Sequence, residues 1–158
     1  MRIGLGYDVH PFTPDRPLWL GGIVVPSDCG LKGHSDADVA IHALCDALLG
    51  AAGMRNIGYH FPDTQGNEFE GIDSKILLRR VMTMLREAGY ELGNCDMTIC
   101  AQVPKLNPYI PAMQACLAEV MGVQPSQINI KATTSEHMGF IGREEGMAAY
   151  AVALINEQ

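Results

Sequence analysis

The chain has 158 residues, a length that accommodates one domain with a hydrophobic core and leaves little room for a second. Hydrophobic residues make up 47% and charged residues 18%, which is typical of a folded globular protein and excludes a disordered one. The formal charge is -7, and the 11 Lys and Arg residues form no basic cluster, so we expect no nucleic-acid binding.

The cysteines and the N-terminus indicate the compartment. Five cysteines are present without a C-x-x-C pair, which argues against a disulfide framework and favours a reducing environment. The N-terminal segment has no long apolar run and no small-residue cleavage site, and no stretch is long enough to span a membrane. We therefore expect a cytoplasmic protein without membrane contact, although a mature plastid form with its transit peptide removed would look the same.

The first half of the chain predicts a strand, a hairpin and a helix. Apolar runs flank Gly21 and Gly22, which indicates a hairpin turn, and Ser35 or Asp36 is expected to cap the helix that Gly53 ends. The expected elements, in chain order, are a strand at 1–10, a hairpin at 18–26, a Gly-rich loop at 27–35, a helix at 36–52 and a long polar loop at 54–71.

The second half alternates helices and strands, and Asp73 is expected to cap its first helix. Helix-linked strands of this kind favour an α/β fold in which some strands pair antiparallel. The expected elements are a helix at 73–89, a strand in the second half of 91–104, a helix at 108–121, a strand at 126–132, a loop at 133–146 and a final strand at 147–156.

The final strand is apolar on both faces. The odd positions from Met147 to Ile155 are Met, Ala and Ile, and the even positions from Ala148 to Leu154 are Ala, Tyr, Val and Leu. One face can pack under helices, whereas the other needs a second cover. A partner subunit is the simplest cover, and a central strand covered by its own chain is the alternative. We thus expect a single α/β domain with a mixed sheet, helices on one face and a subunit contact on the other.

A metal site is one interpretation of the first motif, "GYDVHPF". Asp8 and His10 lie two apart on a strand, so their side chains share a face. In the first helix, Asp38, His42 and Asp46 follow at intervals of four and line one helical face. Two imidazoles and a carboxylate with an open fourth position form a catalytic zinc site, in which Asp46 or Asp38 would orient a ligand. The alternative is a solvated polar face.

Two further motifs suit an anion. In "GHSDAD", a helix N-terminus follows His34, which can donate to a phosphate oxygen; the alternative is an ordinary helix cap. In "KATTSE", three hydroxyls precede Glu136, which can hold Mg²⁺; the alternative is an ordinary polar loop. Lys105 and Arg143 lie in neighbouring loop motifs and can bind phosphate.

Together the motifs "GYDVHPF", "GHSDADVAIHALCDALLGA", "NIGYHFPDT", "AQVPKLNPYI" and "IKATTSEHMGFIGREEG" resemble the 2-C-methyl-D-erythritol 2,4-cyclodiphosphate synthase family. Their order and spacing match that family from Arg2 to about Ile155, as one domain over residues 1–158. The resemblance implies an enzyme of the non-mevalonate isoprenoid pathway. It would cyclise 4-diphosphocytidyl-2-C-methyl-D-erythritol 2-phosphate to 2-C-methyl-D-erythritol 2,4-cyclodiphosphate and release CMP, as a phosphorus-oxygen lyase.

The resemblance also implies a homotrimer with active sites between subunits, and it assigns the ions. Asp8, His10 and His42 match the ligands of one Zn²⁺ per subunit, and Glu136 matches the ligand of Mg²⁺ or Mn²⁺. His34 and Thr134 match residues that stabilise the transition state. Arg143 and Glu145 match residues near an axial cavity that can hold an isoprenoid diphosphate.

The substrate contacts implied by the resemblance fall into segments spread over the chain. They are Asp8, Val9, His10, His34, Ser35, Asn56, Ile57, Gly58, Phe61, Pro62, Asp63, Thr64 and Gln65 beside the zinc, and Ala101, Gln102, Val103, Pro104, Lys105, Leu106, Asn107, Thr133, Thr134, Ser135, Glu136, Phe140 and Arg143 around the cytidine and phosphates. Asn56 and Gln65 stand where the family usually has Asp, which removes a negative charge at each position. Val9 is expected to face the core.

Two other functions fit the same motifs. One is a trimeric metal- or isoprenoid-binding protein without activity, and the other is an enzyme of this fold with a different nucleotide substrate. The chain has no Gly-rich nucleotide-binding domain ahead of the first motif, so we expect no fused cytidylyltransferase. A cytidylyltransferase on a separate partner protein is the alternative.

Overall fold

The computed structural model describes residues 1–62 and 71–158, and its framework is a five-stranded mixed sheet. The strands, in the order in which they lie side by side, are β4 (Gly30–Leu31), β1 (Arg2–Thr13), β7 (Gly146–Glu157), β5 (Tyr90–Cys100) and β6 (Ile128–Thr133). Strand β7 pairs antiparallel with both β1 and β5, and β6 joins β5 in parallel. A separate hairpin consists of β2 (Leu18–Leu20) and β3 (Ile23–Val25).

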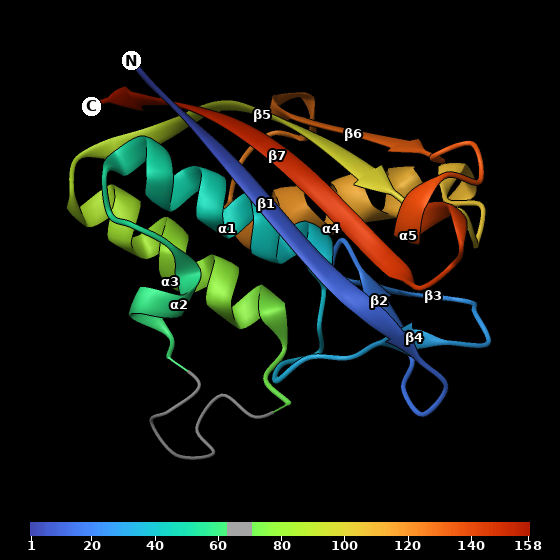
Figure 1. Cartoon of the computed structure of the whole chain (residues 1–158). Coiled ribbons are helices and arrows are strands. Elements are labelled where there is room, and N and C mark those ends of the chain that lie inside the picture. The colour runs from blue at the N-terminus through green and yellow to red at the C-terminus, as the bar shows by residue number, and fades with distance from the viewer. Residues whose placement is uncertain (63–70) are drawn as a thin grey trace.

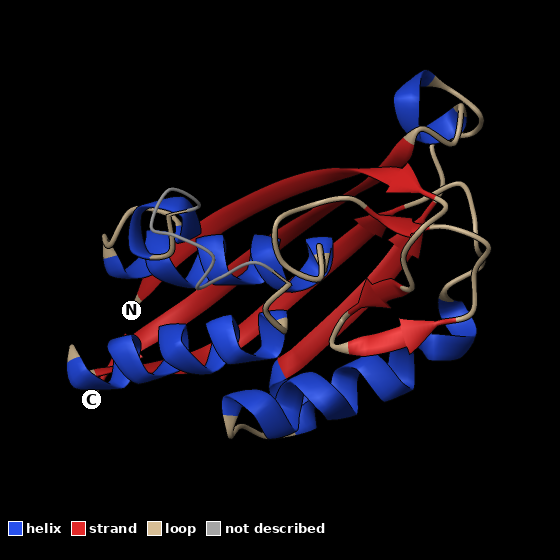
Figure 2. Cartoon of the chain, turned by 90° about the horizontal axis from the view of Figure 1, so that it is seen from below, coloured by secondary structure: helices blue, strands red, loops and turns tan. Residues whose placement is uncertain are grey.

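The long helices lie together on one side of this sheet (Figures 1 and 2). They are α1 (Val39–Ala52), α3 (Ser74–Glu87) and α4 (Ile110–Met121), and the short helical segments are α2 (Ile57–His60), η2 (Asn107–Tyr109), η3 (Pro125–Gln127) and α5 (Gly139–Gly142). The predicted single-domain α/β fold with helices on one face is therefore confirmed. Among the described residues, no helix is long and apolar enough to cross a bilayer.

Several predicted boundaries were wrong, because pairing partners and local caps decided them. Strand β5 spans residues 90–100 instead of the second half of 91–104: it pairs with β7 along this whole length, with a register shift between Leu92 and Asn94 that accommodates Gly93. The predicted loops contain β4, α2 and α5. These elements have two to four residues, too few for a periodic pattern to show.

Asp38, not Ser35 or Asp36, caps α1. Its carboxylate accepts the backbone N–H of Ile41 at 3.1 Å, of Gly21 at 2.9 Å and of Gly22 at 2.7 Å. Burial raises the pKa of Asp38, against the effect of these hydrogen bonds. Both glycines have positive φ angles of 59° and 82°, as the tight turn between β2 and β3 requires. Asp38 thereby ties the hairpin to the helix that carries His42.

The packing of β1 on α1 depends on two glycines. A Cβ atom at Gly4 would lie 2.0 Å from the carbonyl oxygen of Ala47, and a Cβ at Gly6 would lie 1.9 Å from that of Ala43. These contacts involve helix backbone, which cannot move aside as a flexible side chain can. The strand and the helix therefore approach closely enough for Asp8 and His10 to reach His42.

Gly6→Ala is expected to lower the free energy of unfolding by about 3 kcal/mol, because the added methyl group pushes the helix away from the strand. Gly50→Ala is the matched control, since its Cβ would meet nothing within 4 Å and the site is helical. We expect the control to be neutral or to stabilise by up to about 1 kcal/mol. Urea unfolding of both variants measures the difference; equal stabilities would contradict the packing argument.

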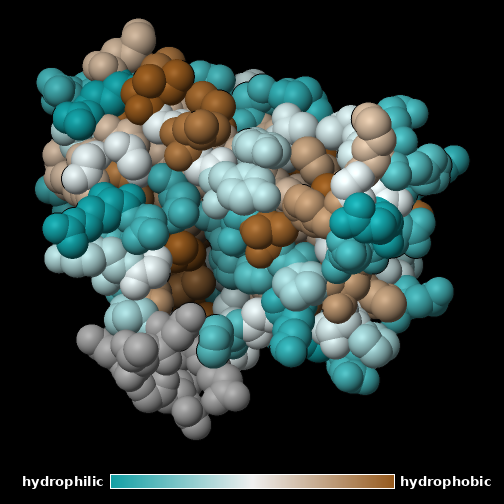
Figure 3. All heavy atoms as spheres, in the orientation of Figure 1, coloured by the Kyte–Doolittle hydropathy of each residue, from teal (hydrophilic) through white to brown (hydrophobic). Residues whose placement is uncertain are grey.

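The opposite face of the sheet is apolar and exposed in the chain. On β1 the outward side chains include Ile3 and Leu5, which are 70% and 68% exposed, and on β7 they include Tyr150 and Val152. The inward side chains of β7, from Met147 to Ile155, are fully buried. Figure 3 shows apolar atoms gathered over the N-terminal half of β1 and the neighbouring part of β7. The two-faced strand that the sequence predicted is thus present, with one face uncovered by the described residues.

Val9 belongs to this outward face, so the prediction that it faces the core was wrong. Its side chain is 42% exposed. The alternation of the strand places it opposite Asp8 and His10, which point toward α1, and the described residues supply no layer on its own side.

Candidate active site

Asp8, His10 and His42 converge on one point between β1 and α1. The Asp8 Oδ2 atom lies 2.8 Å from His10 Nε2 and 3.1 Å from His42 Nδ1, and the two ring nitrogens are 3.2 Å apart. His42, more than 30 positions further along the sequence, thus joins Asp8 and His10 in presenting three potential ligand atoms to one place. The sequence prediction that these side chains meet is confirmed.

This donor set fits a zinc ion. Ligand atoms at the usual Zn–N and Zn–O distances occupy tetrahedron corners about 3.3 Å apart, close to the separations seen here. The His10 Nδ1 atom lies 3.0 Å from the carbonyl oxygen of Lys32, which can only accept, so Nδ1 carries a proton and Nε2 is the nitrogen that can present a lone pair to a cation. Three ligands leave the fourth corner for a water molecule or a substrate oxygen.

The electrostatics of the cluster keep the carboxylate ionised. Burial pushes the pKa of Asp8 upward, but hydrogen bonds with His10 and His42 outweigh it and lower the pKa to about 2. Burial also pushes the pKa of His42 downward, and the hydrogen bond and charge of Asp8 outweigh that effect and raise it. Asp8 is therefore a negatively charged ligand at neutral pH, which suits a divalent cation.

A cavity of about 330 Å³ opens beside these three residues. It brings together predicted metal ligands, predicted phosphate contacts and predicted erythritol contacts, and its lining includes His10, His34, Ser35, His42, Ile57, Gly58 and Phe61. Pro62 is described but does not line this cavity, and Asp63, Thr64 and Gln65 lie outside the described residues. Six of the described zinc-side contacts thus line one cavity, whereas Asp8, Val9 and Asn56, like Pro62, are not part of its lining.

Two predicted site residues fix the backbone of α2 within that lining. The Asp46 Oδ1 atom accepts the backbone N–H of Ile57 at 2.7 Å, and the Asn56 Oδ1 atom accepts that of Tyr59 at 3.2 Å. Burial raises the pKa of Asp46, against the hydrogen bond from Ile57. The hydrogen bond to Asp46 therefore positions α2, which contributes to the cavity lining, and the side-chain carbonyl of Asn56 caps the N-terminus of α2.

Sequence reasoning missed three residues that support the site. The Arg16 guanidinium donates to the carbonyl oxygens of Gly33, at 2.7 Å, and of Ser35, so it holds the loop that carries His34. Ser74 Oγ contacts Nε2 on the far side of the His42 ring, and Asp36 accepts the hydrogen bond that Ser74 Oγ donates. For Ser74 and Asp36 the sequence offered only a general signal, because a Ser or an Asp near a predicted helix start indicates a cap. For Arg16 it offered no specific signal.

A second cavity, of about 340 Å³, gathers the predicted cytidine and phosphate contacts. Its lining combines two segments: Ala101, Gln102, Pro104, Lys105, Leu106, Asn107 and Pro108 from one, and Ala132, Thr133 and Thr134 from the other. The backbone N–H of His137 donates to Gln102 Oε1 at 3.1 Å and ties the segments together. None of the described residues lines both this cavity and the one beside the His–Asp cluster.

The remaining predicted contacts lie around the 133–145 segment. Glu136 has a positive φ of 55° and an exposed side chain, and its N–H donates to Thr134 Oγ1 at 3.3 Å. Ser135 Oγ donates to the Met138 carbonyl, and Phe140 is 39% exposed. Arg143 and Glu145 form an exposed ion pair at 3.1 Å. The structure thus places Glu136 beside Thr134, and Glu136 is not part of the lining of the cavity at the His–Asp cluster.

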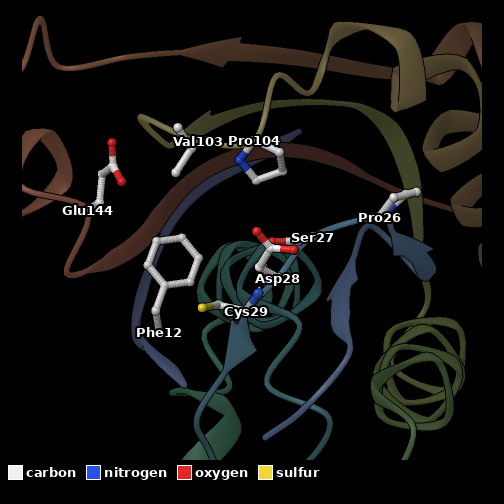
Figure 4. A pocket seen from close by; sticks show the side chains of 8 residues that line it. All are labelled: Phe12, Pro26, Ser27, Asp28, Cys29, Val103, Pro104 and Glu144. Atoms are coloured by element: carbon white, nitrogen blue, oxygen red, sulfur yellow. Dashed lines mark hydrogen bonds between the residues drawn. The ribbon is translucent and has the colours of Figure 1, made fainter. Parts of the chain in front are cut away.

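A third and larger cavity, of about 640 Å³, involves Val103 of the predicted contacts (Figure 4). Phe12, Val103 and Pro104 give it apolar walls, and Figure 4 shows the carboxylates of Asp28 and Glu144 among the side chains that line it. Its acidic side chains make it a poor match for a phosphate-bearing ligand.

Comparison with known proteins gives one consistent family. The model of the YgbB family matches residues 1–156. A relative from Parabacteroides distasonis, named 2-C-methyl-D-erythritol 2,4-cyclodiphosphate synthase, is 66% identical over 98% of this chain and 96% of its own length.

Solved structures agree with that match. The bifunctional IspDF from Campylobacter jejuni is 44% identical with a TM-score of 0.95; the match covers 99% of this chain but only 42% of the bifunctional protein. An IspF from Plasmodium falciparum, solved as a CDP complex, is 32% identical with a TM-score of 0.86, and the match covers 99% of this chain and 96% of that one.

Proposed function

The chain belongs to the YgbB family of 2-C-methyl-D-erythritol 2,4-cyclodiphosphate synthases, enzymes of the non-mevalonate isoprenoid pathway, and on this premise we propose its substrate, ions and assembly. The substrate is 4-diphosphocytidyl-2-C-methyl-D-erythritol 2-phosphate, and the products are 2-C-methyl-D-erythritol 2,4-cyclodiphosphate and CMP. The whole chain, residues 1–158, acts as one catalytic domain. The observation that carries this proposal is the convergence of Asp8, His10 and His42 beside a cavity lined by the other zinc-side contacts.

The proposed assembly is a homotrimer in which each active site lies between two subunits. Two observations support it: the zinc-side and cytidine-side contacts line different cavities of one chain, and the apolar outer face of β1 and β7 needs a cover. A partner's cytidine cavity facing this chain's His–Asp cluster would complete a site. The CDP complex of the Plasmodium falciparum relative supports a cytidine diphosphate group as the ligand.

The proposed ions are one Zn²⁺ per subunit on Asp8, His10 and His42, and Mg²⁺ or Mn²⁺ on Glu136. When bound, these cations would neutralise and polarise the phosphates, which lets a chain of net charge -7 bind a polyanion. The donor chemistry supports the assignment, since imidazole suits zinc and a lone exposed carboxylate suits a hard cation.

In the proposed reaction, an oxygen of the substrate's 2-phosphate attacks the β-phosphorus, a P–O bond forms, and the bond from that phosphorus to the CMP oxygen breaks. No side-chain nucleophile is needed, because the attacking oxygen is already ionised. His34 and Thr134 donate hydrogen bonds to phosphate oxygens where negative charge builds up. Asp46 and Asn56 hold the α2 backbone in place beside the erythritol. Such positioning of the reacting groups can lower the activation barrier by up to about 7–11 kcal/mol, and it supplies most of the rate enhancement.

The cytidine end is held by the second cavity and by the predicted contacts around it, residues 101–107 and 133–136. The Lys105 side chain is exposed at its edge, where an ammonium can meet a phosphate. Around the trimer axis, Arg143 and Glu145 would border a cavity for an isoprenoid diphosphate. The proposed location is cytoplasmic.

The test is release of CMP from the proposed substrate by purified protein supplied with Zn²⁺ and Mg²⁺. We expect turnover with the CDP-linked substrate and a rate at least tenfold lower with the UDP-linked analogue. Equal rates would remove the cytidine assignment. Absence of turnover by a folded, zinc-loaded oligomer would favour the alternative of a binding protein without activity.

A further inference from the structure

Behind the His42 ring, on the side away from Asp8, lies a fully buried hydroxyl that the proposed chemistry does not use. Ser74, the first residue of α3, has an exposed fraction of 0%. Its Oγ atom lies 2.9 Å from His42 Nε2 and donates to Asp36 Oδ1, and its backbone N–H donates to Asp36 Oδ2 at 2.9 Å. Three segments, the loop before α1, α1 itself and the start of α3, meet at this point.

The chemistry of these groups fixes where the proton of His42 resides. A hydroxyl has one proton, and the Ser74 proton goes to the Asp36 carboxylate, which can only accept. The Ser74 oxygen is therefore left as an acceptor toward His42, and Nε2 must carry the imidazole proton. The other nitrogen, Nδ1, is the atom that faces Asp8 and His10, so it is the nitrogen left to present a lone pair when a cation is bound.

Asp36 is itself anchored, so the chain of hydrogen bonds has a fixed direction. Its Oδ1 also accepts the backbone N–H of Asp38 at 3.1 Å, and its own N–H donates to the Ile72 carbonyl at 3.1 Å. A second hydroxyl, Ser35 Oγ, lies 3.1 Å from the same His42 Nε2, but it accepts from the Ala37 N–H and donates to no carboxylate among the described residues. Ser35 can adapt to either tautomer of His42, whereas Ser74 cannot.

We propose that Ser74 and Asp36 are positioning residues that hold His42 in the tautomer presenting Nδ1 to the metal. The inference rests on the proposed zinc site, and it extends that site to the start of α3. His10 is held in the same manner by the Lys32 carbonyl, so both imidazoles are set by groups behind them.

The test compares Ser74→Ala with Ser35→Ala, which removes the other hydroxyl from the same nitrogen. Zinc affinity is measured by competition with a chelator, and the presence of the proton on His42 Nε2 is read from the ¹⁵N shift of that nitrogen in the metal-free protein. We expect Ser74→Ala to weaken zinc binding about 10–100-fold and to populate the tautomer with the proton on Nδ1. Ser35→Ala should keep the Nε2–H tautomer and change the zinc affinity less than about threefold.

Several outcomes would overturn the proposal, and they are distinct from failure of the zinc site. Unchanged tautomer and affinity in Ser74→Ala would refute the positioning role, provided that His42→Ala has lost zinc. If His42→Ala keeps stoichiometric zinc, the metal site itself is refuted. Should Ser74→Ala fail to fold, Ser74→Cys carries the same comparison, because the thiol fills the space but hydrogen-bonds weakly; wild-type tautomer and affinity there would equally refute the role.

Discussion

His42→Ala is expected to abolish zinc binding and to lower the rate of CMP release by at least about 10³-fold, while the protein remains folded. The imidazole supplies one of three ligand atoms that lie within 3.2 Å of one another, so its loss leaves only Asp8 and His10. The helix should survive, because Asp38 caps α1 and the buried apolar residues of α1 are untouched. Metal analysis of the purified variant and far-UV circular dichroism check the two halves of this prediction.

His60→Ala is the matched control for that experiment. His60 is a partly buried histidine of α2 whose Nε2 contacts the Met54 carbonyl at 2.7 Å, and it has no contact with the cluster recorded among the described residues. We expect one zinc per subunit to remain in this variant. Stoichiometric zinc in His42→Ala, or zinc loss in both variants, would contradict the ligand assignment.

Leu5→Asp is expected to convert the proposed trimer into monomers and to remove activity with it. Leu5 is 68% exposed on the outer face and pairs across the strands with Val152, so burial in a subunit contact would surround it with apolar groups. An unpaired carboxylate there costs several kcal/mol per subunit when the face is covered. Separate monomers would lack the cavity that a neighbour supplies. Light scattering gives the mass, and the CMP assay gives the activity.

Val24→Asp is the control for the oligomer. Val24 is also an exposed aliphatic residue, at 49%, but it lies on β3 of the separate hairpin. This variant should stay trimeric with unchanged mass. A monomeric wild type, or a Leu5→Asp variant that remains trimeric and active, would refute the assignment of this face as the subunit contact.

The sequence predicted which candidate site residues share a face, because the patterns that indicate this are local. The alternation of β1 placed Asp8 and His10 on one face, and the structure confirms that they share it. The spacing of four placed His42 on the helical face with Asp46, and both now line or support the same cavity region. The two apolar faces of 147–155 were equally local, since a strand alternates with a period of two.

Where sequence reasoning failed, contacts between distant segments were decisive. Val9 looked like a core residue because it is aliphatic and lies between two polar neighbours, yet the described residues supply no layer on its side of the sheet. Asp38 replaced the expected caps because the turn of the β2–β3 hairpin, 16 or 17 residues earlier in the chain, offers two further N–H groups to its carboxylate. Strand β5 extended beyond its apolar half because β7 pairs along its full length.

By itself, then, the sequence determined the fold class, the ligand types and the face on which each ligand lies, since these follow from chain periodicity and donor chemistry. Only the tertiary structure decided that two glycines let β1 approach α1, that Ser74 and Asp36 close in behind His42, and that the cytidine-side residues line a different cavity. The physical reason is the same in each case. Hydrogen bonds and close contacts between segments 30 or more residues apart depend on the packed arrangement, which no local pattern encodes.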